Sequence, residues 1–180
     1  MGGARLTLFH FHGTRGNGLI HARVAPIVRE VELLAPIVDH FEMQGFRAVP
    51  EVSVAGRRAD IVAVRDDALL AVELKVSAWP HALRQAMAYQ VWAPEAFVAL
   101  PFPRAMRAVR HRHRFDGVGV GLLAVLDGEV RTFLPAALSP RLFPALSDFV
   151  RRQLSPPPTS PLDAFPDEGT GERFYGKGRM

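Results

Sequence analysis

The stretch LLAVELKVS, Leu69 to Ser77, places two charged residues in an otherwise apolar segment. In a β-strand, successive side chains point to opposite faces. Leucine and valine at positions 70, 72, 74 and 76 then line one face, which suits a hydrophobic core. Glu73 and Lys75 share the other face, two positions apart. The pattern predicts a strand with one buried face, and it leaves open whether the charged face is only solvated or forms a site.

Lysine is rare in this chain, which makes its presence at position 75 informative. Of the 22 basic residues, 20 are arginine, and the two lysines are Lys75 and Lys177. A lysine ammonium is a compact charge whose pKa shifts readily on burial, whereas a guanidinium is planar and always charged. Lys75 therefore indicates a chemical role, because a position that needed only surface charge would be arginine in this protein.

The composition is that of a globular protein of one domain. The chain has 180 residues, of which 48% are hydrophobic and 22% charged, and it contains no cysteine. The lack of cysteine excludes disulfides and thiolate metal sites, and it favours a cytoplasmic location. We expect no membrane association, because no apolar run approaches the roughly 20 residues that span a bilayer. The N-terminus MGGARLTLFHFHG is also too short in its apolar part for a signal peptide.

Positive charge favours an anionic partner. The net charge is +4 and the isoelectric point is near 10.3. Five arginines and no acidic residue occur in PRAMRAVRHRHRF, residues 103–115. This pattern is typical of a patch that contacts phosphates. A solvated helix face is an equally good interpretation of such a run. The residues predicted to bind nucleic acid are Arg107, Arg110, Arg112 and Arg114.

The chain divides into three parts. Residues 1–25 are turn-rich and show no clear period, so we expect an N-terminal extension. Residues 26–154 form the predicted domain, and residues 155–180 form a Pro/Gly-rich tail that we expect to be disordered. His10 and His12 in the extension have the spacing of same-face strand residues, but the sequence offers no third metal ligand beside them.

Helical and strand periods alternate along the domain. A stripe of apolar residues predicts a first helix from Pro26 to Gly45, and Pro36 within it predicts a kink or two abutting helices. Short connections typical of antiparallel hairpins then join three predicted strands. These strands are 47–54, 57–64 and 69–76.

The second half of the domain continues this alternation. Asp127–Gly128 is a strong hairpin signal between two strands. We therefore predict an α/β fold, with a mixed sheet covered by helices on both faces. The predicted elements are a helix at 79–92, a strand at 96–100, a helical arginine-rich segment, strands at 117–126 and 130–136, and a helix at 140–154.

Carboxylates can meet Glu73 from two other elements. Asp60 lies in the second predicted strand, and antiparallel pairing can place it beside Glu73. Two carboxylates can hold a hard cation such as Mg²⁺, which keeps several of its waters. A third acid comes from the first helix, as Glu30 or Glu32. Glu30 borders the apolar stripe of that helix and Glu32 points away from it, so burial favours Glu30.

The pattern Asp60…Glu73-x-Lys75 resembles the signature of the PD-(D/E)xK nuclease superfamily, although Ala59 replaces the proline before the aspartate. Gln85 and Tyr89 are similar to the Gln-x-x-x-Tyr motif of its RecB-like branch. The predicted elements also resemble the restriction-endonuclease-like core of that superfamily: a helix, a three-stranded antiparallel meander, a helix and a strand. A helix–hairpin–helix then forms a C-terminal addition.

The resemblance implies a metal-dependent deoxyribonuclease, in DNA repair or defence. Asp60 and Glu73 would hold Mg²⁺ or Mn²⁺, Lys75 would act on the attacking water, and Gln85 and Tyr89 would brace the site. Small bacterial members of the superfamily have a proline in the first helix, as this chain has at Pro36. Aligning the chain with them on that proline would make Glu32 the helix acid.

The same fold can also serve as a non-catalytic module that binds nucleic acid or a protein, which is the alternative function. DNA is the expected partner. A homodimer, and a protein partner bound through the tail, are left open by the sequence.

Overall fold

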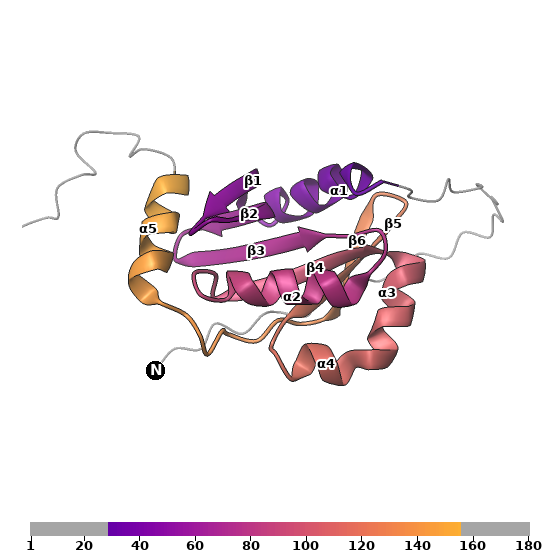
Figure 1. Ribbon diagram of the computed structural model, residues 1–180. Helices are drawn as coiled ribbons and strands as arrows, with labels where there is room; N and C mark the ends of the chain where they lie inside the picture. The colour runs from indigo at the N-terminus through magenta and orange to yellow at the C-terminus, as the bar shows by residue number, and fades with distance from the viewer. Residues whose placement is uncertain (1–28, 156–180) are drawn as a thin grey trace, which may run out of the picture.

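The computed structural model describes residues 29–155, so the predictions for Pro26, for the N-terminal extension with His10 and His12, and for the tail lie outside the described residues. The described chain forms one six-stranded sheet with the strand order β1-β2-β3-β4-β5-β6 (Figure 1). The strands are β1 Arg47–Val54, β2 Arg57–Arg65, β3 Ala68–Leu74, β4 Glu95–Pro101, β5 Gly121–Leu126 and β6 Glu129–Leu134. The helices are α1 Val31–Glu42, α2 Trp79–Tyr89, α3 Phe102–Ala108, the 3₁₀-helix η1 Val109–His111, α4 Arg112–Asp116 and α5 Pro144–Leu154.

The sheet is mixed, which confirms the predicted α/β class. Strands β1, β2 and β3 form an antiparallel meander, whereas β3, β4 and β5 run parallel and β6 returns antiparallel to β5. Parallel neighbours need a crossover. Helix α2 supplies it between β3 and β4, and α3, η1 and α4 supply it between β4 and β5. The β5–β6 hairpin therefore continues the same sheet.

Helices cover both faces of the sheet. Leu33, Ile37 and Phe41 of α1 pack against one face, together with Ile61 and Val72. Helix α2 lies on the other face, with α5 over the β1–β2 end and α3 and α4 over the β4–β5 end (Figure 1). Burial on both faces explains why β3 and β4 are almost continuously apolar.

The first helix differs from its prediction in two respects. It begins at Val31, after a bend at Arg29 and a turn at Glu30, which becomes its N-cap residue. It also continues through Pro36 as one helix, so the alternative of two abutting helices is wrong. Packing of the apolar stripe against the sheet outweighs the one backbone hydrogen bond that Pro36 cannot make.

Three predicted strands, β3, β5 and β6, are too long at one end, and β6 ends at Leu134. Strand β3 ends at Leu74, although the backbone N–H of Lys75 still donates to the carbonyl of Ala99 in β4 at 3.0 Å. Strand β5 begins at Gly121, because residues 117–119 close helix α4. A Cβ on Gly121 would lie 2.3 Å from the ring of Phe97, so glycine is required there for steric reasons. The predicted helix at 79–92 ends at Tyr89.

The Asp127–Gly128 hairpin is confirmed. Asp127 has φ 56° and Gly128 has φ 81°, so both central residues have the positive φ of a two-residue type I′ turn.

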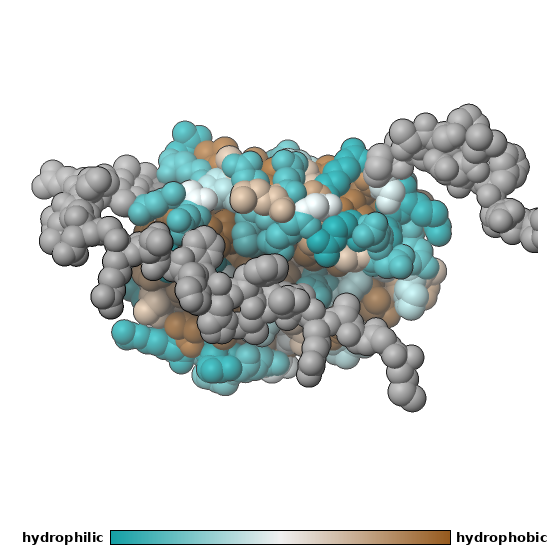
Figure 2. Space-filling model, turned by 180° about the vertical axis from the view of Figure 1, so that it is seen from behind, coloured by the Kyte–Doolittle hydropathy of each residue, from teal (hydrophilic) through white to brown (hydrophobic). Residues whose placement is uncertain are grey.

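The surface of the described chain is mostly polar. Hydrophilic residues alternate with smaller hydrophobic areas on the face seen in Figure 2. The exposed large hydrophobic side chains, such as Met43, Leu138 and Phe143, are spread over different segments. None of the helices within residues 29–155 has the length and apolar character needed to cross a membrane.

Candidate active site

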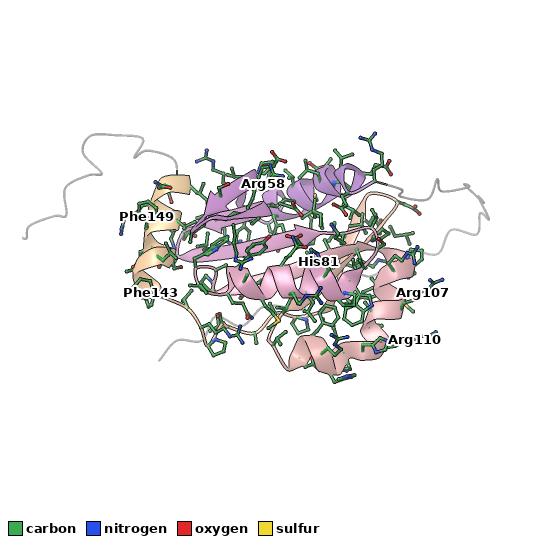
Figure 3. The ribbon with its side chains drawn as sticks, viewed as in Figure 1. Arg58, His81, Arg107, Arg110, Phe143 and Phe149 are labelled. Atoms are coloured by element: carbon green, nitrogen blue, oxygen red, sulfur yellow. The ribbon has the colours of Figure 1, made fainter. Side chains whose placement is uncertain are left out.

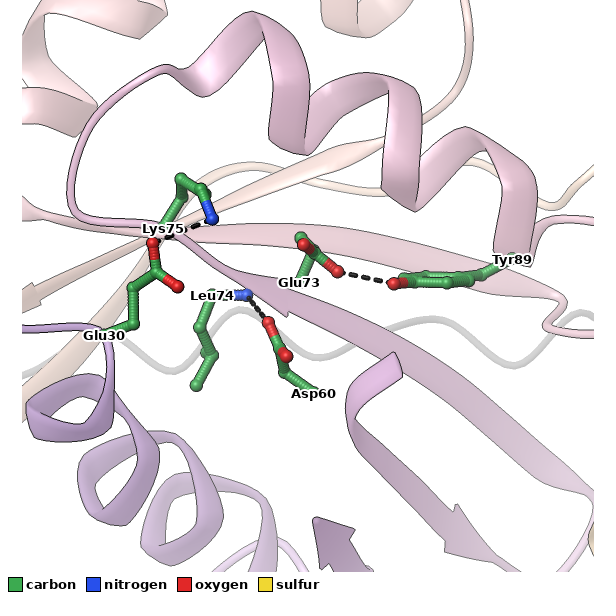
Figure 4. A network of polar contacts seen from close by, with 6 residues as sticks. All are labelled: Glu30, Asp60, Glu73, Leu74, Lys75 and Tyr89. Carbon is green, nitrogen blue, oxygen red and sulfur yellow. Dashed lines mark hydrogen bonds and ion pairs between the residues drawn. The ribbon is translucent and has the colours of Figure 1, made fainter. Parts of the chain in front are cut away.

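Asp60 and Glu73 lie side by side on neighbouring strands, as the sequence predicts. The pair Ile61–Val72 in the β2–β3 register puts Asp60 opposite Glu73, and strand alternation places both on the face that α2 covers. Asp60 Oδ2 accepts a hydrogen bond from the backbone N–H of Leu74 at 2.7 Å (Figure 4). Two carboxylates therefore meet near the carboxyl end of β3.

Glu73 is buried, and its hydrogen-bond partner within residues 29–155 is Tyr89. Glu73 is 3% exposed and Tyr89 is 2% exposed. The Tyr89 hydroxyl lies 2.5 Å from Glu73 Oε2 and 2.8 Å from the carbonyl oxygen of Arg58. A tyrosine hydroxyl has one proton to donate. The Tyr89 hydroxyl therefore shares its proton between the Glu73 carboxylate and the Arg58 carbonyl.

Burial of the two carboxylates raises their pKa values. Desolvation raises the pKa of Glu73 to about 7, against the opposing effect of the Tyr89 hydrogen bond, and the charge of Asp60 adds to the rise. Desolvation also raises the pKa of Asp60, with the hydrogen bond from Leu74 acting against it. A cation beside two such carboxylates would stabilise their ionised forms, so the pair is a favourable binding site for a cation.

Lys75 forms an ion pair with the N-terminus of α1. Its Nζ lies 2.8 Å from Oε1 of Glu30 (Figure 4). The hydrogen bond from Lys75 to Glu30 is the main reason why the pKa of Lys75 is raised, so this amine stays protonated at neutral pH. Of the two candidate helix acids, the structure thus brings Glu30 to the site, while Glu32 lies exposed in the first turn of α1.

Gln85 stands one helical turn before Tyr89 on α2, as the predicted motif requires. Its Oε1 is buried and has no hydrogen-bond partner within residues 29–155. An unpartnered buried acceptor costs about 1–3 kcal/mol, so a water molecule or ligand group is expected to bind it. His81 extends the same stripe by one more turn and is exposed (Figure 3).

The carboxylates fit a hard divalent cation. Asp60 Oδ1 and Glu73 Oε1 have no hydrogen-bond partner among the described residues, so each carboxylate has one uncommitted oxygen. No group of three or more histidine and acidic side chains in that part of the chain could hold a metal. Two carboxylate ligands completed by water suit Mg²⁺, which retains several waters.

The structure separates the four arginines that were predicted to bind nucleic acid. Arg107 and Arg110 project outward from α3 and η1 (Figure 3). Arg112 forms an ion pair with Asp116 at 3.2 Å, and the Arg114 guanidinium lies 5.0 Å from the centre of the Trp79 ring. Contact of this segment with DNA stays a prediction.

Comparisons with known proteins give information on the fold and none on the function. No family model and no curated protein matches the chain. Among solved structures, it is similar to the SPO1766 protein of unknown function from Silicibacter pomeroyi. The two share 18% identity and a TM-score of 0.56, over 71% of this chain and 85% of that chain. At this identity the similarity shows a shared fold alone.

Proposed function

We propose that the protein is a divalent-metal-dependent nuclease of the PD-(D/E)xK class, with a restriction-endonuclease-like core, that hydrolyses phosphodiester bonds in DNA. One observation carries the proposal. The half-buried carboxylate of Asp60 and the buried carboxylate of Glu73 lie on one face of adjacent strands, and the protonated amine of Lys75 follows at the end of β3. This combination suits metal-assisted phosphodiester hydrolysis, which uses a cation site, an activated water and stabilisation of developing negative charge.

Asp60 and Glu73 would hold Mg²⁺ or Mn²⁺, which supplies Lewis-acid activation of water and neutralises phosphate charge when bound. Glu73 must lose its proton to act as a ligand. The Tyr89 hydroxyl can then donate to the ionised carboxylate and fix its orientation. The uncommitted Oε1 of Gln85 is available to accept a hydrogen bond from a water in the site.

Lys75 would act as a hydrogen-bond donor. Because Glu30 raises its pKa, the amine is protonated and has no lone pair with which to take a proton from water. An ammonium has three donor hydrogens. One can remain on Glu30 while others orient the attacking water and stabilise the charge that develops on the phosphate.

The test is a cleavage assay on single- and double-stranded DNA with Mg²⁺, Mn²⁺ or EDTA. We expect metal-dependent cleavage by the wild type, and a loss of about 100-fold or more in Lys75→Ala, the scale on which removal of one preorganised donor acts. Lys177→Ala removes the other lysine of the chain and is the matched control. The proposal fails if no DNA is cleaved with either metal, or if Lys75→Ala cleaves as fast as the control.

A non-catalytic DNA-binding module is the second candidate. It is favoured by the engagement of Lys75 with Glu30, and by the lack of a cluster of three metal ligands within residues 29–155. Such a module would gain no affinity for DNA from Mg²⁺ over EDTA at matched ionic strength, and it would leave every substrate intact.

A further inference from the structure

Helix α3 is brought to the same edge of the sheet as Lys75. Strands β3 and β4 are parallel, so their carboxyl ends meet at one edge. Lys75 directly follows β3, and α3 directly follows β4 at Phe102. Open sheets bind ligands outside the carboxyl ends of parallel strands. The two segments therefore flank the place where a substrate of the candidate active site would lie.

A hollow of about 160 Å³ lies between these two segments. This volume is well above the roughly 10–15 Å³ of accessible space that admits one water molecule. Ser77 on its wall is two residues beyond Lys75, so the two Cα atoms are at most about 7 Å apart. The hollow thus adjoins the candidate active site. Its lining residues are Ser77, Ala78, Trp79, Leu100, Arg104 and Arg107.

The charge of this hollow is positive and uncompensated. Arg104 and Arg107 are three residues apart on α3, so they project from one side of the helix. Both are exposed, and neither forms an ion pair within residues 29–155, unlike Arg112 and Arg151. None of the lining residues is acidic. Arginine side chains without an ion pair favour an anion that can accept several hydrogen bonds, so the hollow that Arg104 and Arg107 line suits such a ligand.

Aromatic stacking fixes the geometry of the hollow. The Trp79 ring stacks on Phe115 at 5.4 Å and on His111 at 5.5 Å between ring centres. The Arg114 guanidinium lies over the same ring. These contacts attach the end of the arginine-rich segment to the beginning of α2. The wall is therefore formed before a ligand arrives, which lowers the entropic cost of binding.

We propose that this hollow binds one phosphate group of a nucleic-acid strand, next to the phosphate that lies at Asp60, Glu73 and Lys75. The assignment of the neighbouring phosphate rests on the proposed function. The group bound can be an internal phosphate of the strand or a terminal phosphate, since both present the same oxygens to Arg104 and Arg107.

The experiment measures binding without cleavage. The dissociation constant of a short fluorescent single-stranded oligonucleotide is followed by anisotropy in EDTA over a range of salt concentrations. We expect Arg104→Ala/Arg107→Ala to lower the slope of log K against log salt by about 0.7 for each lost phosphate contact. The matched control is Arg141→Ala/Arg152→Ala, which removes the same charge from exposed positions near and in α5. Equal slopes for the two double variants would overturn the proposal.

Conservative variants and modified strands complete the design. Arg104→Lys/Arg107→Lys keeps the charge and should keep most of the slope, whereas a slope as low as that of the alanine pair would overturn a role in charge recognition. Oligonucleotides with a 5′-phosphate, a 3′-phosphate or neither separate the two sources. If the alanine pair loses a preference for one phosphorylated end, the hollow binds a terminal phosphate. If it loses affinity for all three strands equally, the phosphate is internal.

The outcome is independent of the test of the proposed function. If the wild type cleaves DNA but Arg104→Ala/Arg107→Ala binds like its control, the phosphate site is wrong and the proposed nuclease function stands. If the wild type cleaves no DNA but Arg104→Ala/Arg107→Ala has a lower salt dependence of binding, the phosphate site stands and the proposed nuclease function is wrong.

Discussion

Tyr89 and Glu73 join helix α2 to strand β3 through a contact of 2.5 Å between the phenol oxygen and the carboxylate. The same hydroxyl reaches the carbonyl of Arg58 at 2.8 Å, so one side chain spans two strands and holds a proposed metal ligand. Both residues are almost fully buried. The contact therefore orients Glu73 and opposes the rise in its pKa that burial causes.

Tyr89→Phe should weaken both the fold and the site. It removes the hydrogen bond that lowers the pKa of Glu73 and leaves the Arg58 carbonyl without its tyrosine partner. We expect a loss of about 1–3 kcal/mol in the free energy of unfolding, from urea titration. The pH at which cleavage becomes half-maximal should also rise. Tyr175→Phe changes the other tyrosine of the chain and serves as the control. An unchanged pH profile in Tyr89→Phe would contradict this role.

The stability of the metal-free protein should depend on the titration of Glu73. Its pKa is about 7 in the folded state against an ordinary 4.5, so the folded state holds this proton more tightly than the unfolded state. The free energy of unfolding should then fall as pH rises from about 4.5 to about 7, and level off above that, with a total on the order of 3 kcal/mol.

Glu73→Gln isolates this contribution, because the amide does not titrate. The difference in unfolding free energy between wild type and Glu73→Gln, measured in EDTA from pH 4 to 9, should follow the curve just described. The variant should be the more stable protein at pH 8, although it loses cleavage. A difference that does not vary with pH would mean that the pKa of Glu73 is the same in the folded and unfolded states.

Asp60→Asn should separate metal binding from DNA binding. The variant keeps the shape of the side chain but loses an anionic oxygen ligand, so cleavage and the rise in melting temperature with added Mg²⁺ should both disappear. Binding of DNA in EDTA should stay equal or tighten, because one carboxylate no longer repels the phosphate. Asp67→Asn, in the exposed β2–β3 turn, is the control. A wild-type Mg²⁺ response in Asp60→Asn would place the metal elsewhere.

The pairing of Asp60 with Glu73 could be predicted because it depends on local rules. Strand alternation and a short hairpin fix which residues share a face, and both signals are present in the sequence. The ends of elements were less predictable. The alternation of apolar and other residues in β3 continues past Lys75 in the sequence. The strand nevertheless ends at Leu74, because the chain turns toward α2 through Ala78 with φ 42°.

The hollow beside Lys75 could not be predicted from the pattern of arginines. Its two walls are far apart in sequence, since Ser77 and Arg104 are separated by 27 positions, and they meet because β3 and β4 are parallel neighbours. Sequence reasoning grouped Arg107 with Arg112, but the structure pairs Arg112 with Asp116 and places Arg107 beside Arg104. The tertiary arrangement thus decides which of the arginines line the hollow, and the sequence pattern alone does not distinguish among them.

The choice between Glu30 and Glu32 gives the sharpest test of the site. Both acids are at the start of α1, so Glu30→Gln and Glu32→Gln remove the same charge from the same helix end. Glu30 forms an ion pair with Lys75, in which Nζ lies 2.8 Å from Oε1. We expect Glu30→Gln to slow cleavage by about ten- to hundredfold, since a hydrogen bond to a charged group contributes about 1.5–3 kcal/mol. Glu32→Gln should stay within about twofold of the wild type, as is usual for surface substitutions. Steady-state rates for the two variants decide the matter, and a reversed order would assign the helix acid to Glu32.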